Sequence, residues 1–87
     1  MKIYKFFSPT CGPCKVLARN LKKANVAPIA VDITDEDNAP LVEKYQVKSI
    51  PTLVIESEDG KLISKSSKLL SPIQITDFIK EAINVIG

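Results

Sequence analysis

Short apolar runs and segments of helical periodicity alternate along this chain, and their order restricts the folds open to it. Residues 2–7 contain four large apolar side chains with little polar alternation, which is typical of a strand covered on both faces. Residues 13–25 place apolar side chains at helical spacing and basic side chains on the opposite side. Residues 28–33 form a second apolar run that begins with a proline, as an edge strand can. The chain therefore begins with the order β-α-β.

The central part of the chain predicts a short helix followed by a hairpin. Acidic and amide side chains at residues 35–38 supply capping groups and favourable charge for a helix from Pro40 to about Gln46. Residues 52–55 are β-branched or apolar and predict a third strand. A short turn with a glycine leads to a fourth strand at residues 61–66, so these two strands should pair.

The last helix has the clearest signals of its start. Ser71 is suited to the N-cap, Pro72 to the first helical position, and Gln74 to closing a capping box. The stripe expected to face the core consists of Ile75, Phe78, Ile79, Ala82, Ile83 and Ile86.

The complete order β-α-β-α-β-β-α predicts an α/β fold with a minimal four-stranded mixed sheet and helices on both faces. Right-handed crossovers place the first strand centrally, between the second and the third. A chain of 87 residues has room for one core, so residues 1–87 are expected to form a single domain. The turn after the first strand then lies at a carboxyl edge of the sheet, where α/β folds place their sites.

Composition and charge exclude several classes of function. Apolar residues make up 45% of the chain and charged residues 25%, the balance of a soluble globular protein. A net charge of +2 without a basic run gives no reason to expect nucleic acid as a partner. The N-terminal apolar stretch is interrupted by Lys5 and is too short for a signal sequence or a membrane span, so we expect a cytoplasmic protein. Structural disulfides are rare there, which makes a close cysteine pair a redox or metal-binding candidate.

That pair lies in the segment Cys11-Gly12-Pro13-Cys14, directly after the first strand. Cys11 falls at the start of the helix, where free backbone N–H groups and the helix dipole stabilise a thiolate and lower the thiol pKa. Cys14 lies about one turn further on and can reach the sulfur of Cys11, as a resolving thiol must. Gly12 should let the backbone turn tightly, and Pro13 should stiffen the intervening pair.

These motifs resemble thioredoxin over essentially the whole chain. The resemblance rests on Cys11-Gly12-Pro13-Cys14-Lys15 after an aromatic strand and on Ile50-Pro51-Thr52 ahead of the third strand. The extra N-terminal strand and helix of ordinary thioredoxins are missing, so in size the chain is similar to glutaredoxins and to the short thioredoxin-like proteins of archaea and phages. The resemblance implies a cis peptide bond before Pro51, which would stand against the two sulfurs, and a substrate pairing with the backbone of Ile50.

Four departures from the thioredoxin pattern concern the surroundings of the cysteines. Thr10 replaces the usual tryptophan, and Lys5 replaces the buried acid six residues before the first cysteine. The lysine partner of that acid aligns with Ala30, and the loop before the last helix, residues 66–69, lacks its usual glycine. Lys5 can pack its stem along the sheet with the ammonium in water, or it can lie close to the sulfurs. The residues expected to contact substrate are Thr10, Ile50, Ser67 and Lys68.

The resemblance implies a monomeric protein-disulfide reductant that cycles between dithiol and disulfide, needs no bound cofactor and is recharged by a thioredoxin reductase. Glutathione as the donor, in a glutaredoxin-like activity, is one alternative. A thioredoxin-fold interaction module with incidental cysteines is another. A structural disulfide is disfavoured, because so short a loop stabilises little. Zinc needs four ligands, and with no histidine and only two cysteines the chain could bind it only between two copies.

Overall fold

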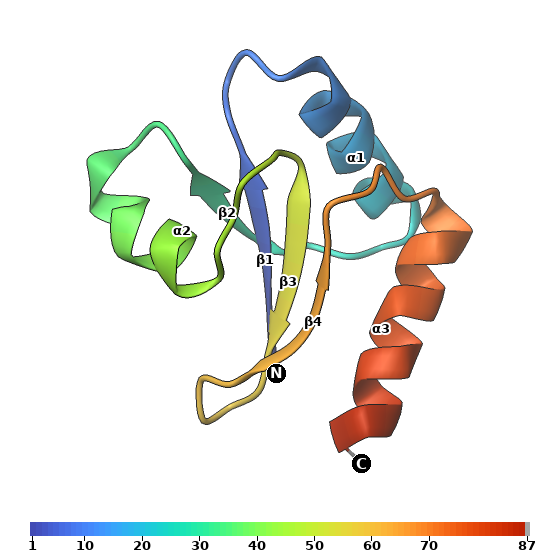
Figure 1. The fold of residues 1–87 in the computed structure, drawn as a ribbon. Helices are drawn as coiled ribbons and strands as arrows, with labels where there is room; N and C mark the ends of the chain where they lie inside the picture. Colours follow the sequence, from blue (N-terminus) through green and yellow to red (C-terminus); the bar gives the residue numbers. More distant parts are fainter. Residues whose placement is uncertain (87) are drawn as a thin grey trace.

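In a computed structural model that describes residues 1–86, the predicted order of elements is confirmed. The strands have the order β2-β1-β3-β4 in one sheet; β1 is parallel to β2 and antiparallel to β3, which pairs with β4 in the predicted hairpin. Figure 1 shows α2 on one side of this sheet and α1 with α3 on the other. The elements are β1 (Lys2–Phe7), α1 (Gly12–Lys23), β2 (Ile29–Asp32), the 3-10 turn η1 (Glu36–Asn38), α2 (Ala39–Lys44), β3 (Thr52–Glu56), β4 (Leu62–Ser66) and α3 (Pro72–Ile86).

The first two helices end earlier than their apolar periodicity predicts. Asn25 and Gln46 have φ values of 60° and 50°, in the left-handed region that ends a helix. The residue that follows each of them donates a backbone hydrogen bond back into the helix. The N–H of Val26 donates to the carbonyl of Leu21 at 2.9 Å, and the N–H of Val47 donates to the carbonyl of Val42 at 3.0 Å. Both ends are therefore Schellman motifs, formed without the usual glycine.

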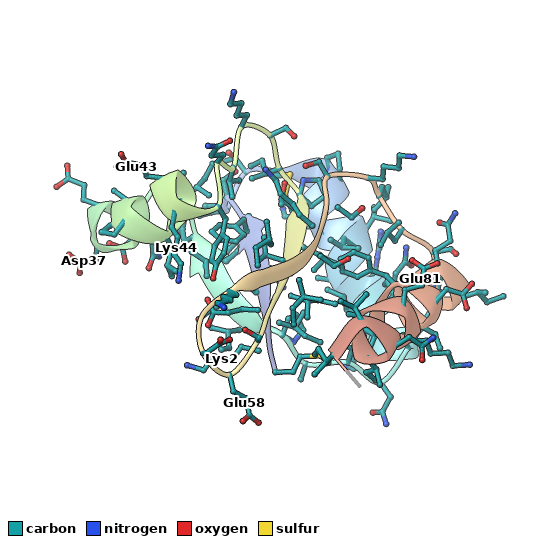
Figure 2. The ribbon with its side chains drawn as sticks, turned by 60° about the horizontal axis from the view of Figure 1, so that its bottom comes forward. Lys2, Asp37, Glu43, Lys44, Glu58 and Glu81 are labelled. Atoms are coloured by element: carbon teal, nitrogen blue, oxygen red, sulfur yellow. A yellow bond between two sulfur atoms is a disulfide. The ribbon has the colours of Figure 1, made fainter. Side chains whose placement is uncertain are left out.

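Two apolar clusters hold the helices to the sheet. The cluster on the α2 side is centred on the buried Tyr4 and Phe6 of β1 and Tyr45 at the end of α2. The cluster on the other side joins Leu17 and Leu21 of α1 to Leu53 of β3, Leu70 and Ile75. Figure 2 shows Asp37, Glu43 and Glu58 pointing outward, away from these layers. No helix within residues 1–86 is both long and apolar enough to cross a membrane.

The start of α3 agrees with the sequence prediction, and its end differs. The backbone N–H of Ser71 donates to Gln74 Oε1 at 2.9 Å, and the N–H of Gln74 donates to Ser71 Oγ at 3.2 Å, which is a complete capping box. Ile83 and Ile86 were expected in the core, but they are 51% and 53% exposed. The inward stripe ends at Ala82 because the last turn of α3 extends beyond the sheet (Figure 1).

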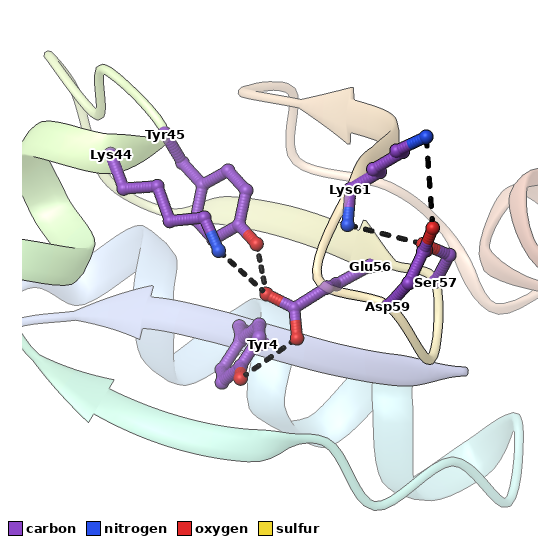
Figure 3. A network of polar contacts seen from close by, with 7 residues as sticks. All are labelled: Tyr4, Lys44, Tyr45, Glu56, Ser57, Asp59 and Lys61. Atoms are coloured by element: carbon purple, nitrogen blue, oxygen red, sulfur yellow. Dashed lines mark hydrogen bonds and ion pairs between the residues drawn. The ribbon is translucent and has the colours of Figure 1, made fainter.

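A buried carboxylate that the sequence did not signal lies at the end of β3. Glu56 is only 6% exposed; Tyr45 and Tyr4 donate hydrogen bonds to it, and Lys44 lies 3.6 Å away. Figure 3 shows these side chains converging on Glu56. The hydrogen bond from Tyr45 holds the pKa of Glu56 below its usual range, despite the opposing effect of burial. Because Glu56 pairs with Lys2 at the start of β1, this network lies at the end of the sheet away from the cysteines.

Candidate active site

The loop after β1 places Cys11 at the entrance of α1. β1 ends at Phe7, and the backbone N–H of Cys11 donates to the carbonyl of Ser8 at 3.2 Å, closing a turn. Cys11 is the N-cap residue of α1, with an extended backbone. The sulfur predicted to be the nucleophile therefore lies at the positive end of a twelve-residue helix.

Cys11 and Cys14 are joined in a disulfide, with their Cα atoms 5.2 Å apart. The backbone N–H of Cys14 donates to Cys11 Sγ at 3.1 Å, so the cysteine sulfur occupies the place of a capping oxygen. Cys11 is partly exposed, whereas Cys14, in the first turn of the helix, is only 4% exposed. Cys11 is therefore accessible to another molecule, whereas Cys14 is accessible mainly to Cys11.

The two residues between the cysteines lie in the first turn of α1 and are exposed. A Cβ atom on Gly12 would meet no atom within 4 Å, and Gly60 is the only glycine with a positive φ among the described residues. Neither its backbone conformation nor the space around it therefore requires a glycine at position 12. Pro13 fits where it was predicted, because a proline within the first helical turn loses no hydrogen bond there.

The segment before β3 lies at the same edge of the sheet as the cysteine loop, because Thr52 pairs with Phe6 near the end of β1. The Ile50–Pro51 bond is cis, as the resemblance implied, and Pro51 is buried. The Thr52 hydroxyl donates to the carbonyl of Ser49 at 2.7 Å and is 3.1 Å from Ser67 Oγ. This hydroxyl pair ties the start of β3 to the loop after β4. Nothing in the sequence pattern signalled it.

The remaining residues expected to contact substrate differ in their surroundings. Thr10 is exposed and directly precedes Cys11, while Ile50 is half-buried beside Pro51. Ser67 is brought to the site edge by its contact with Thr52. Lys68 is exposed, and its backbone N–H donates to Ser66 Oγ at 3.3 Å.

Lys5 lies beneath α1 on the central strand. It is half-buried and pairs with Ala30 of β2, the residue aligned with the missing lysine partner. Its Nζ lies 5.4 Å from the centroid of the Phe7 ring. Lys5, Phe7 and Cys14 line one cavity of about 220 Å³.

The chemistry available to this site is thiol–disulfide exchange. Within residues 1–86, no cluster of three or more histidine, cysteine, aspartate or glutamate side chains could hold a metal ion. A disulfide between an accessible sulfur at a helix N-terminus and a buried sulfur one turn along can be opened and closed reversibly by attack of thiolates.

Comparison with known proteins gives the relationship of the chain. The family model described as Thioredoxin matches residues 1–81. A protein disulfide-isomerase of Hordeum vulgare is 32% identical over 90 residues, covering 93% of this chain but only 18% of its own length. The SPbeta prophage-derived thioredoxin-like protein YosR of Bacillus subtilis is 26% identical over 81 residues, covering 93% of this chain and 98% of its own.

A solved structure agrees with these sequence matches. Thioredoxin 1 from Thermosipho africanus superposes with a TM-score of 0.74, covering 99% of this chain and 98% of its own. At 18% identity, that similarity is one of fold. With the family match over residues 1–81 and the cysteine pair at the start of α1, this chain belongs to the thioredoxin family.

Proposed function

We propose that this chain is a thiol–disulfide oxidoreductase that reduces disulfides in protein substrates. The observation that carries the proposal is the position of the partly exposed Cys11, whose sulfur accepts a hydrogen bond from Cys14 N–H at the start of α1 and is bonded to the buried Cys14. Family membership supports it, although the chain spans only 18% of the length of the protein disulfide-isomerases it matches.

The reaction begins with the reduced chain. The Cys11 thiolate attacks one sulfur of the substrate disulfide, a Cys11–substrate bond forms, and the other substrate sulfur leaves with the bonding electron pair. The Cys14 thiolate then attacks Cys11 Sγ and displaces the second substrate sulfur. Two electrons have passed from the chain to the substrate, whose two sulfurs take up protons from water. The chain is left with the Cys11–Cys14 bond.

The exposed surface around Cys11 provides the substrate contacts in this proposal. The backbone of Ile50, next to the buried Pro51, pairs with an extended substrate segment, and the exposed Thr10, Ser67 and Lys68 frame the approach. With Thr10 in place of a large aromatic residue, the approach to the sulfur is open and polar. We assign recharging to a thioredoxin reductase in the reducing cytoplasm, with glutathione as the alternative donor.

An insulin-reduction assay tests this function and identifies the donor. The purified chain is supplied with NADPH and a thioredoxin reductase in one series, and with reduced glutathione, glutathione reductase and NADPH in another. We expect NADPH oxidation that depends on the chain in the first series, and none with Cys11→Ser. Activity only in the second series would make the chain glutaredoxin-like. Absence of activity in both, with equally inert Cys11→Ser and parent proteins, would contradict the proposed function.

A further inference from the structure

A lysine on the inner face of the central strand has no counter-charge. Side chains alternate between the two faces of β1, and Lys5 lies opposite Leu53, which belongs to the apolar cluster beneath α1 and α3. Lys5 is half-buried, and none of the ion pairs formed among residues 1–86 includes it.

The ammonium of Lys5 is directed toward the cysteine end of the strand. Phe7 lies two residues further along the same face of β1, nearer the loop that carries Cys11. Lys5 Nζ lies 5.4 Å from the centroid of the Phe7 ring, within the range of a cation–π contact. This contact holds the charge away from the opposite end of the sheet.

Lys5 and the buried Cys14 line the same cavity. This cavity has a volume of about 220 Å³. Its wall includes Lys5, Phe7 and Cys14, and the other charged residue in the wall is Lys15. A neighbouring cavity of about 350 Å³ shares Lys5 and contains one further charged residue, Lys22. The charged side chains that line either cavity are all lysines, so no carboxylate in these walls neutralises the ammonium of Lys5.

We propose that Lys5 is a positioning residue that stabilises the thiolate of Cys14 for the resolving step. This inference rests on the proposed function. Cys14 must lose its proton to water before its sulfur bonds to Cys11 and displaces the substrate sulfur. A cation close to a poorly hydrated thiolate favours the charged form. Lys5 forms no bond and accepts no proton, and it lowers the cost of holding a negative sulfur on Cys14, which is only 4% exposed.

The test measures Cys14 alone. In a Cys11→Ser background Cys14 is the only thiol, and its rate of alkylation against pH gives its titration curve. We expect Lys5→Met to move the midpoint upward by about one pH unit, a tenfold loss of acidity, which is the lower end of the range of about 1–3 units for a neighbouring opposite charge. Lys5→Arg keeps the charge, so its midpoint should stay close to that of the parent.

The matched control is Lys22→Met, which removes a lysine from the neighbouring cavity and leaves the cavity of Cys14 intact. It should leave the midpoint within about 0.2 units, because exposed charges are screened by water and salt. Lys15→Met tests the second lysine beside Cys14 and should have a smaller effect than Lys5→Met, because Lys15 is exposed. Equal midpoints for Lys5→Met and its parent, or equal shifts for Lys5→Met and Lys22→Met, would overturn the proposal.

A second readout uses the protein with both cysteines. Equilibration against glutathione buffers between pH 6 and pH 10 should give the same ratio of disulfide to dithiol for the parent and Lys5→Met at pH values where Cys14 is protonated. At higher pH the variant should become harder to reduce, by up to about tenfold, since its thiolate form has lost the stabilising charge. A difference that is constant over the whole range would indicate a structural effect and refute the electrostatic role.

The thiol titration does not depend on catalysis. If the parent protein fails to reduce insulin, the proposed function is contradicted, whatever the titration shows. If the parent reduces insulin but Lys5→Met leaves the Cys14 midpoint unchanged, only the proposed role of Lys5 is contradicted. Far-ultraviolet circular dichroism of each variant identifies a loss of fold.

Discussion

Removal of the Tyr45 hydroxyl isolates one hydrogen bond to the buried carboxylate of Glu56. A hydrogen bond to a charged group contributes about 1.5–3 kcal/mol, and the ring that packs in the core is retained in Tyr45→Phe. The bond from Tyr4 is long, at 3.4 Å against about 2.5–3.0 Å for an ordinary O–H···O contact, so it contributes less. We therefore expect Tyr45→Phe to lower the free energy of unfolding at pH 7 by about 1.5–3 kcal/mol and Tyr4→Phe by less than about 1 kcal/mol.

The pH dependence of this difference follows from the lowered pKa of Glu56. A carboxyl group whose pKa is depressed by folding contributes stability above its unfolded pKa, about 4.3, and loses that contribution as the pH falls through the folded value. Protonation also turns the bond from Tyr45 into one between neutral groups, which contributes about 0.5–1.5 kcal/mol. The cost of Tyr45→Phe should therefore be largest at pH 7, should shrink as the pH falls toward the depressed pKa of Glu56, and should be smallest below it.

Urea unfolding followed by circular dichroism at pH 7 and at several pH values below 4 measures these differences. Tyr4→Phe is the matched control, because it removes the same atom from the same carboxylate at a longer distance. Equal losses for the two variants, or a cost of Tyr45→Phe that does not change on acidification, would show that the Tyr45 contact does not stabilise the ionised carboxylate.

Two further predictions concern the helices that position the site. Limiting alkylation of the reduced protein near neutral pH should label Cys11 before Cys14, since Cys11 is partly exposed and Cys14 is 4% exposed; mass-spectrometric mapping that finds Cys14 labelled first would reverse their roles. Ser71→Ala should lower the free energy of unfolding by about 1 kcal/mol through loss of the N-cap, and an unchanged urea midpoint would show that the bonds between Ser71 and Gln74 do not stabilise α3.

The sequence predicted the fold where local and tertiary preferences agree. The apolar run at residues 2–7, the helical stripe behind Pro13 and the capping box at Ser71 each correspond to an element that the sheet and its two clusters also require. The position of Cys11 at the start of a helix followed from the same pattern, because the motif joins the end of a strand to the beginning of an amphipathic stripe.

What could not be predicted depends on contacts between distant parts of the chain. The apolar pattern of α3 continues through Ile86, and only the extent of the sheet decides that Ile83 and Ile86 are exposed. Glu56 looks like the polar end of a strand until Tyr4 and Tyr45, from two other elements, enclose it. The sequence left two hypotheses for Lys5, an ammonium in water or one close to the sulfurs. The cavity that Lys5 shares with Cys14 forms only when α1 packs over β1.

The central claim, that Cys11 attacks a substrate disulfide and Cys14 resolves the product, is tested most directly by trapping the intermediate. Cys14→Ser removes the resolving sulfur, so incubation of the reduced variant with insulin should accumulate a covalent adduct. Mass spectrometry without reductant should locate a mixed disulfide on Cys11 that dithiothreitol releases, and Cys11→Ser treated in the same way should form almost none. An adduct that forms as readily on Cys14 in the Cys11→Ser variant, or no adduct on Cys11 in Cys14→Ser, would contradict the assigned roles.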